Sequence, residues 1–309
     1  MLRTALLAAA RSPVVRRAVE TAAPTRPLVR RFVAGPGVPD ALRAARDLRE
    51  QGVRTSLDHL GEDATSAEQG GTTVRAYRDV LAALAEAGLA GSTEVSVKLS
   101  ALGQALPVDG DKIALENARR ICEAARSAGT AVTLDMEDHT TTDSTLGVLA
   151  ALRVDFPDTG AVLQAQLRRT EGDCRDLARQ GSRVRLCKGA YSAPAAVAFQ
   201  RSSEVDGSFA RCLGVLMAGP GYPMVATHDP RMVALAGRLA ARHGRPAETY
   251  EHQMLYGVRP DEQQRLAAEG NRLRVYVPYG QEWYGYFTRR LAERPANVAF
   301  FLRSLATRS

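Results

Sequence analysis

From residue 51 onward the chain alternates between two kinds of segment. Short apolar segments rich in β-branched residues are followed by polar or glycine residues, and then by longer stretches with apolar residues at every third or fourth position. The first kind predicts buried strands and the second predicts amphipathic helices. The predicted strands are 53–60, 95–99, 131–135, 161–165, 183–187, 224–227, 248–253 and 273–277. The predicted helices include 72–87, 112–127, 172–180, 203–218, 231–242, 260–269 and a last one at about 282–292.

Strands that alternate with helices predict parallel pairing with crossover connections. Eight such units in about 250 residues have the count and size of a (β/α)8 barrel. A doubly wound sheet would carry a glycine-rich fingerprint after its first strand, but the chain reads Gly61-Glu62-Asp63 there. We therefore predict an α/β protein with a TIM-like barrel at residues 51–309, forming one functional domain, and a helical arm at residues 1–50.

Polar residues stand at the end of every predicted strand. The C-terminal ends of barrel strands meet at one mouth, where the active sites of such barrels lie. The residues concerned are Asp58/Glu62, Lys98, Asp135/Glu137/Asp138, Gln164/Gln166, Arg185/Lys188, Thr227/His228/Asp229, Glu251/Gln253 and Tyr276/Tyr279. The pattern predicts an enzyme with its site at that mouth.

Charge is distributed unevenly along the chain. The formal net charge is +7, but residues 1–35 hold seven arginines and one acid, so the remainder carries about +1. This distribution argues against a nucleic-acid-binding body. The basic arm is interpreted either as a solvated helical face or as a peripheral contact with anionic lipid. We expect no nucleic-acid partner and a cytoplasmic protein, peripheral at the inner face of the membrane if the arm binds lipid.

The chain uses arginine almost everywhere, and its only lysines are Lys98, Lys112 and Lys188. Lys112 lies in a polar run typical of a helix start. Lys98 and Lys188 each stand at a strand end, where a compact ammonium can do what a planar guanidinium cannot. They are therefore candidate site residues, against the alternative of a lysine whose ammonium reaches solvent beside a strand.

Residues 276–293 combine aromatic and basic side chains. Trp283, Tyr286 and Arg290 share one helix face, and Arg289 can reach Glu293 one turn later. An aromatic wall beside guanidinium donors suits a small apolar ring that carries a carboxylate. By contrast, the five histidines show no metal-ligand spacing and the four cysteines form no pair typical of a zinc site. We expect no metal.

Several segments together resemble the proline dehydrogenase family, specifically its bacterial monofunctional form. They are VSVKLSAL, TLDMEDH, VLQAQLRRTEGD, VRLCKGAY, ATHD, a variant of EFQMLYG, and YVPYGxxWYxYxTRRxxERPxN, in the family's order. The resemblance extends from Leu28 nearly to the C-terminus. It implies a distorted (β/α)8 barrel with N-terminal helical arms.

The resemblance also implies the activity. Members of the family oxidise L-proline to Δ1-pyrroline-5-carboxylate with FAD, and pass the electrons to a membrane quinone. A functional coupling to a pyrroline-5-carboxylate dehydrogenase is expected with it.

Site residues are implied by matching the family's motifs position by position. Asp135 and Arg185 would be catalytic, with Asp135 holding Lys98 and a substrate-side tyrosine, and Arg185 bonding the flavin near N5. The substrate-binding residues would be Lys98, Tyr276, Tyr286, Arg289 and Arg290. The residues lining FAD would be Met136, Gln164, Arg185, Lys188, Gly189, Ala190, Thr227 and His228. Glu293 would pair with an arginine that binds the carboxylate.

Two departures from the family pattern and three alternative functions remain at this point. His252 replaces an aromatic residue, and residues 192–196 replace a more polar stretch. The alternatives are a hydroxyproline dehydrogenase, a Schiff-base aldolase with Lys98 or Lys188 as nucleophile, and a non-enzymatic lipid or nucleic-acid binder that acts through the arm.

Overall fold

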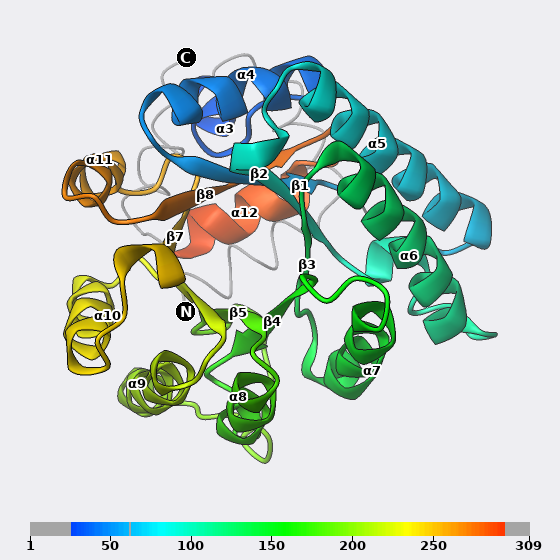
Figure 1. Cartoon of the computed structure of the whole chain (residues 1–309). Helices are drawn as coiled ribbons and strands as arrows, with labels where there is room; N and C mark the ends of the chain where they lie inside the picture. The colour runs from blue at the N-terminus through cyan, green and yellow to red at the C-terminus, as the bar shows by residue number, and fades with distance from the viewer. Residues whose placement is uncertain (1–25, 62, 294–309) are drawn as a thin grey trace, which may run out of the picture.

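The computed structural model describes residues 26–61 and 63–293, in which eight parallel strands close into a barrel in sequence order (Figure 1). The strands are β1 (Arg54–His59), β2 (Thr93–Val97), β3 (Val132–Leu134), β4 (Gly160–Gln164), β5 (Arg183–Cys187), β6 (Tyr222–Ala226), β7 (Glu251–Leu255) and β8 (Leu273–Tyr279). The barrel closes where β1 pairs with β8, from Arg54 beside Arg274 to His59 beside Tyr279. The predicted fold class is confirmed.

Helices surround the strands. They are α3 (Arg26–Phe32), α4 (Val38–Glu50), α5 (Ala67–Glu86), α6 (Gly110–Ala128), α7 (Thr142–Arg153), α8 (Thr170–Arg179), α9 (Ser202–Ala218), α10 (Pro230–Arg242), α11 (Pro260–Ala268) and α12 (Tyr284–Glu293). Short 3-10 helices lie at η2 (Ala90–Ser92), η3 (Ser100–Leu102), η4 (His139–Thr141) and η5 (Ala247–Thr249).

The two faces of the strands have different chemistry. Outward residues such as Leu57, Val95 and Leu186 are fully buried and form one core with the helices. Inward residues are largely polar, and Arg185 donates to both Ser56 and Glu94 across the barrel. Since side chains alternate along a strand, one register places an apolar layer outside and a polar layer inside.

The sequence pattern located most elements closely but missed some. Strand β5 was predicted at its observed bounds, whereas β7 lies at residues 251–255 and not at 248–253. Helix α7 was not predicted, because its Thr/Ser/Asp-rich start and Gly147 weaken the apolar repeat. The shift of β7 puts Glu251 at the beginning of a strand, so its expected place at the mouth is wrong.

The barrel is distorted at its beginning and end. Helix α12 follows β8 but lies across the centre of the barrel, behind the strands in Figure 1, and not in the outer ring. Helix α4 packs against β1 and β8 instead, with Ala41, Ala45 and Leu48 buried in the main core. The predicted boundary after residue 50 coincides with the end of α4, and the division into arm and barrel stays a prediction.

Helix α3 supports α12. Phe32 and Val33 form a second apolar cluster with Tyr286 and Phe287. Gly257 lets the chain pass close by: its φ is +70°, and a Cβ there would lie 1.8 Å from the carbonyl oxygen of Arg31. Only glycine fits both the left-handed backbone and this approach.

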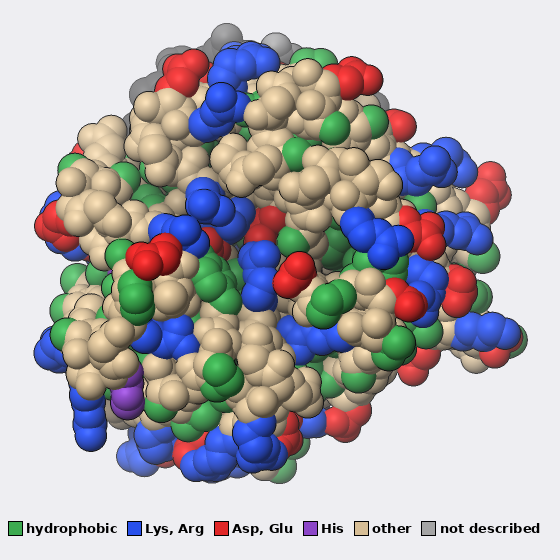
Figure 2. Space-filling model, viewed as in Figure 1, with side chains coloured by type: hydrophobic (Ala, Val, Ile, Leu, Met, Phe, Trp, Pro, Cys, Tyr) green, Lys and Arg blue, Asp and Glu red, His purple; other side chains and the backbone are tan. Residues whose placement is uncertain are grey.

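Both ends of the barrel are polar. Figure 1 looks onto the N-terminal ends of the strands, and Figure 2 shows basic and acidic side chains around the hollow at the centre of that face. A cavity of about 410 Å³ opens there, with Arg54, Glu94, Arg183 and Arg274 in its lining. The candidate site lies at the opposite end of the barrel, between the strands and α12.

Candidate active site

A cavity of about 460 Å³ lies at the C-terminal ends of the strands, beneath α12. It brings together most of the residues that the sequence predicted. Those in its lining are Lys98, Asp135, Met136, Arg185, Lys188, Gly189, Ala190, Thr227, His228, Tyr276, Tyr286 and Arg290. Residues from β2, β3, β5, β6, β8 and α12 thus converge on one space.

Lys98 occupies one side of the cavity between two carboxylates. Its Nζ lies 2.5 Å from Asp58 Oδ1 and 3.8 Å from Asp135 Oδ2, and 3.4 Å from the hydroxyl of Tyr276. Burial lowers the pKa of Lys98, but Asp58 and Asp135 outweigh that effect, so the pKa is raised. Lys98 is therefore a fixed cation, and Asp58 is its nearest partner.

Asp135 connects Lys98 with Arg185. Its Oδ1 accepts from Arg185 Nη1 at 2.7 Å and from Ser96 at 2.8 Å, while its Oδ2 accepts from the Tyr276 hydroxyl at 2.6 Å. Burial and the Asp135 charge hold the pKa of Tyr276 well above its usual value, so this tyrosine remains a donor. The predicted grouping of Asp135, Lys98 and Tyr276 matches these contacts.

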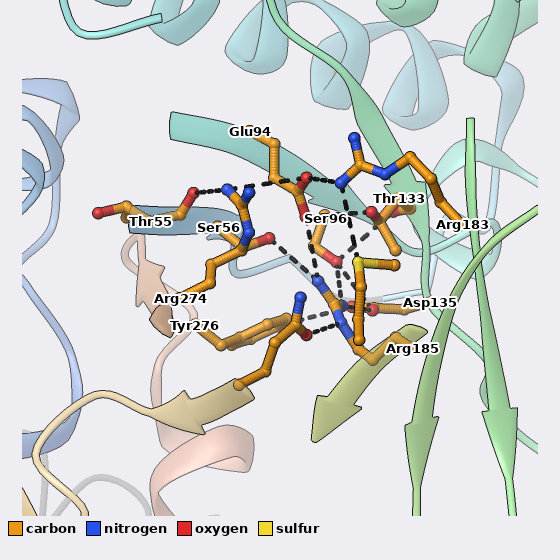
Figure 3. Close-up of polar contacts among 12 residues, drawn as sticks. Thr55, Ser56, Glu94, Ser96, Thr133, Asp135, Arg183, Arg185, Arg274 and Tyr276 are labelled. Atoms are coloured by element: carbon orange, nitrogen blue, oxygen red, sulfur yellow. Dashed lines mark hydrogen bonds and ion pairs between the residues drawn. The ribbon is translucent and has the colours of Figure 1, made fainter. Parts of the chain in front are cut away.

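Arg185 forms the floor of the cavity, and Figure 3 shows its guanidinium among acceptors from other strands. Nε donates to Gln253 at 2.6 Å, and Nη1 donates to Ser96 and Asp135, both at 2.7 Å. Nη2 makes longer contacts, 3.2 Å to Ser56 and 3.5 Å to Glu94. Arg185 therefore has protein acceptors for all its donor groups, and the weakest contacts are those of Nη2.

Helix α12 supplies the opposite wall. Tyr286 and Arg290 line the cavity, and the Arg290 guanidinium carbon lies 5.3 Å from the centre of the Tyr286 ring. Trp283, expected on the same face, packs instead against Phe287 and Tyr284. The side chains of Arg289 and Glu293 lie outside the described residues, so their predicted roles stay predictions.

Lys188 lies at the other end of the cavity and is an ion-paired residue. Its Nζ is 2.5 Å from Asp206 and 2.8 Å from Asp229. Burial lowers its pKa, but hydrogen bonds to these two carboxylates outweigh burial, so the pKa is raised. A Schiff-base nucleophile needs a lowered pKa, and neither Lys188 nor Lys98 has one.

Two further predicted residues lie beside Lys188 on the loop after β6. His228 Nε2 accepts the backbone N–H of Leu255 at 2.9 Å, which leaves the ring hydrogen on Nδ1. Thr227 Oγ1 accepts the backbone N–H of Asp229 at 3.1 Å. Both side chains are thereby fixed in the cavity lining.

Gln164 is the predicted residue that stands apart from the lining. Its amide donates to the carbonyl oxygens of Met136 and Glu137 at 3.0 and 2.9 Å, which fixes its orientation. Its Oε1 is buried and has no hydrogen-bond partner among the described residues. A buried acceptor without a donor is costly, and the predicted contact of Gln164 with a cofactor stays a prediction.

Sequence reasoning missed three residues that organise the site. Asp58 and Gln253 stand out in the sequence only as polar strand ends, yet Asp58 is 1% exposed and pairs with Lys98. Gln253 and Glu94 contact Arg185 from below. No local pattern signals these contacts, because each joins strands that are far apart in the sequence.

A model of the family described as proline dehydrogenase matches residues 41–303. The chain belongs to the proline dehydrogenase family. This confirms the predicted family and the oxidoreductase class. The chain is 39% identical over 281 residues to proline dehydrogenase 1 of Bacillus subtilis, with 91% of each chain covered. It is 40% identical over 282 residues to a proline dehydrogenase of Deinococcus radiodurans, with 90% of each covered.

Longer relatives contain a similar region. The chain is 28% identical to a bifunctional protein PutA of Klebsiella aerogenes, covering 94% of this chain and 25% of that one. A crystal structure of proline utilization A from Bdellovibrio bacteriovorus, inactivated by N-propargylglycine, matches with a TM-score of 0.81 at 25% identity. That match covers 87% of this chain and 33% of the other. The family members thus include chains of about this length and much longer ones.

Proposed function

We propose that the protein oxidises L-proline to Δ1-pyrroline-5-carboxylate, with FAD as the electron acceptor. The observation that carries the proposal is a pair of cations, Lys98 and Arg290, beside an aromatic wall in one cavity of a proline dehydrogenase fold. A carboxylate on a small apolar ring has matching partners there.

The chain's own residues bind and orient the substrate. Lys98 and Arg290 would bind the carboxylate, while Tyr276 and Tyr286 would enclose the ring. Since the Tyr276 hydroxyl is held by Asp135, its ring has one fixed orientation. The reaction needs the ring carbon next to nitrogen held against the acceptor, which is a matter of position more than of acid–base strength.

The same residues influence the substrate amine. The reaction removes a hydride from carbon and a proton from nitrogen, so an amine that has already lost its extra proton reacts more readily. Lys98 and Arg290 are positive, and positive neighbours favour the neutral amine. Asp58 and Asp135 pair with Lys98 and offset part of its share of this effect.

The lining fits FAD. Met136, Val162 and Ala226 offer apolar contacts for a flat ring system. Gln164 stands outside the lining, and its buried Oε1 would accept from an N–H of the cofactor. Arg185 and Lys188 add positive charge where a flavin gains electrons or carries phosphates. When bound, FAD supplies a two-electron acceptor for the hydride. Lys188, Gly189, Ala190, Thr227 and His228 would hold the remainder of the cofactor.

We further propose a membrane quinone as the final acceptor, with peripheral membrane contact from the cytoplasmic side. None of the helices within residues 26–61 and 63–293 is long and apolar enough to cross a bilayer. The product is a cyclic imine in equilibrium with an aldehyde, so its consumption by a pyrroline-5-carboxylate dehydrogenase is chemically consistent with the bifunctional relatives. Residues 1–25 of the basic arm lie outside the described residues.

Three measurements test the proposal. Purified protein should show flavin absorbance, and L-proline should bleach it without oxygen. Steady-state turnover with a quinone analogue should favour L-proline over trans-4-hydroxy-L-proline. This preference distinguishes a proline dehydrogenase from a hydroxyproline dehydrogenase. A colourless protein trapped covalently by borohydride with a keto substrate would refute the proposal in favour of an aldolase.

A further inference from the structure

The polar layer beneath the cavity ends at Arg185. Figure 3 shows the next residues of this layer, Glu94, Arg274 and Arg183, on β2, β8 and β5. Arg274 is 5% exposed and binds Glu251, which is fully buried, through Nε at 2.7 Å and Nη2 at 3.1 Å. Glu251 also accepts from Tyr222 at 3.1 Å. Arg274 and Tyr222 therefore hold Glu251 in place independently of the cavity residues.

Gln253 connects this layer to the cavity floor. Its Nε2 donates to Glu251 Oε1 at 2.6 Å, and its Oε1 accepts from Arg185 Nε at 2.6 Å. A carboxylate can only accept, and a guanidinium can only donate. The amide of Gln253 therefore has one possible orientation, and the residue is 3% exposed.

The residue type at this position also matters. A carboxylate in place of Gln253 would add a further negative partner to Arg185 and would face the negative charge of Glu251. An amide fixes the direction of the Arg185 guanidinium and leaves its charge in place. The nearest negative partners of Arg185 are then Asp135 at 2.7 Å and Glu94 at 3.5 Å.

We propose that Gln253 is a positioning residue, which holds the Arg185 guanidinium at the cavity floor in the orientation that flavin reduction requires. The inference rests on the proposed function. It assigns to Gln253 an effect on the cofactor's electron affinity, because a cation held rigidly in one direction stabilises the negative charge of a reduced flavin. Glu251 and Arg274 act one step further away, by fixing the amide.

The test replaces Gln253 by methionine, which keeps the length and volume but removes both hydrogen bonds. Gln253→Met should lower kcat about 10-fold with KM for L-proline changed less than about twofold, and should lower the flavin midpoint potential by about 30 mV, the two-electron equivalent of a factor of ten. FAD content per chain should stay at the wild-type value. The potential is measured by reductive titration without proline.

Thr133→Val is the matched control. Thr133 is fully buried in the same interior layer and bonds Glu94 at 3.1 Å, without a hydrogen bond to Arg185. It should lose thermal stability as Gln253→Met does, while its potential and kcat stay at wild-type values.

Gln253→Asn is a second variant, since the shorter side chain draws the amide away from Arg185 at smaller cost in packing. It should lower the potential in the same direction. Unchanged potential and kcat in folded Gln253 variants, or equal shifts in the Thr133→Val control, would overturn the inference. Failure of both Gln253 variants to fold would also overturn it, because the residue would then be structural. A wild type that binds flavin but is not reduced by L-proline would refute the proposed function instead, and the potentials would still report on Gln253.

Discussion

Replacing Asp58 by asparagine should change how readily Lys98 stays protonated while leaving its position nearly unchanged. The shape of the side chain is kept, and the amide oxygen can still accept from the Lys98 ammonium. What is lost is the negative charge 2.5 Å from Nζ. Lys98 then depends on Asp135 at 3.8 Å, a carboxylate that Arg185 and Tyr276 already share.

The distances give the size of the effect. At an effective dielectric constant of about 20, unit charges attract by about 7 kcal/mol at 2.5 Å and by about 4 kcal/mol at 3.8 Å. Desolvation offsets most of either gain. Asp58 nevertheless supplies the larger share, so its loss lets burial lower the pKa of Lys98. We expect the net effect to equal one charge-assisted hydrogen bond, about 1.5–3 kcal/mol, or about 10- to 150-fold in kcat/KM.

The assay is the pH dependence of kcat/KM for L-proline, from pH 7 to pH 10, as the ratio of variant to wild type. A raised pKa keeps Lys98 charged in the wild type, whereas the variant loses that proton as the pH rises. The ratio should therefore fall toward alkaline pH. Glu269→Gln, which removes an exposed ion pair with Arg265 on α11, is the control and should give a flat ratio. A flat ratio for Asp58→Asn, with wild-type KM, would refute the reasoning.

Four other substitutions have expected outcomes. Lys98→Arg should lower kcat/KM by at least about 10-fold, because a planar fork does not fit where a compact ammonium lies; wild-type kinetics would contradict this. Arg290→Ala should raise KM for L-proline about 10- to 150-fold, because one charge-assisted hydrogen bond is lost. Flavin absorbance per chain should stay unchanged, which shows that the cofactor still binds. Tyr286→Ser should narrow a preference of about 10- to 100-fold for L-proline over trans-4-hydroxy-L-proline, chiefly through lost proline activity, as kinetics on both substrates would reveal. Gly257→Ala should lower the free energy of unfolding by more than about 2 kcal/mol, because its Cβ would overlap the Arg31 carbonyl; an unchanged melting temperature would argue against the close approach.

The sequence predicts the barrel well because its strands and helices have different apolar periods. It predicts positions less well where period and composition conflict, as in β7, where Glu251 and Gln253 are polar on the inward face and fully buried. Pattern reasoning treats such a strand as half exposed, which is why its bounds were shifted. The place of α12 could not be predicted from its own residues, since its amphipathic pattern is the same in the outer ring and across the mouth.

In the candidate site, too, some features could be predicted from the sequence and others could not. Lys98, Asp135 and Arg185 could be found because they follow strand patterns or family motifs. Their pairing could not: the contact of Lys98 with Asp58 spans 40 residues and that of Arg185 with Gln253 spans 68. Which acids and amides meet a given cation depends on barrel register, and register is a property of the closed structure.

The contact between α3 and α12 has a consequence for the order in which the chain matures. Strand β1 finds its second neighbour only when residues 273–279 have been synthesised, and Arg290 arrives later still. Phe32 in α3 is synthesised early, and its contact with Phe287 can form only after α12 has been made. Closure of the barrel and completion of the proposed carboxylate-binding side are thus both late events of biosynthesis. A nascent chain that ends before α12 would still contain the strand residues around Arg185. It would lack Tyr286 and Arg290, which line the opposite side of the cavity.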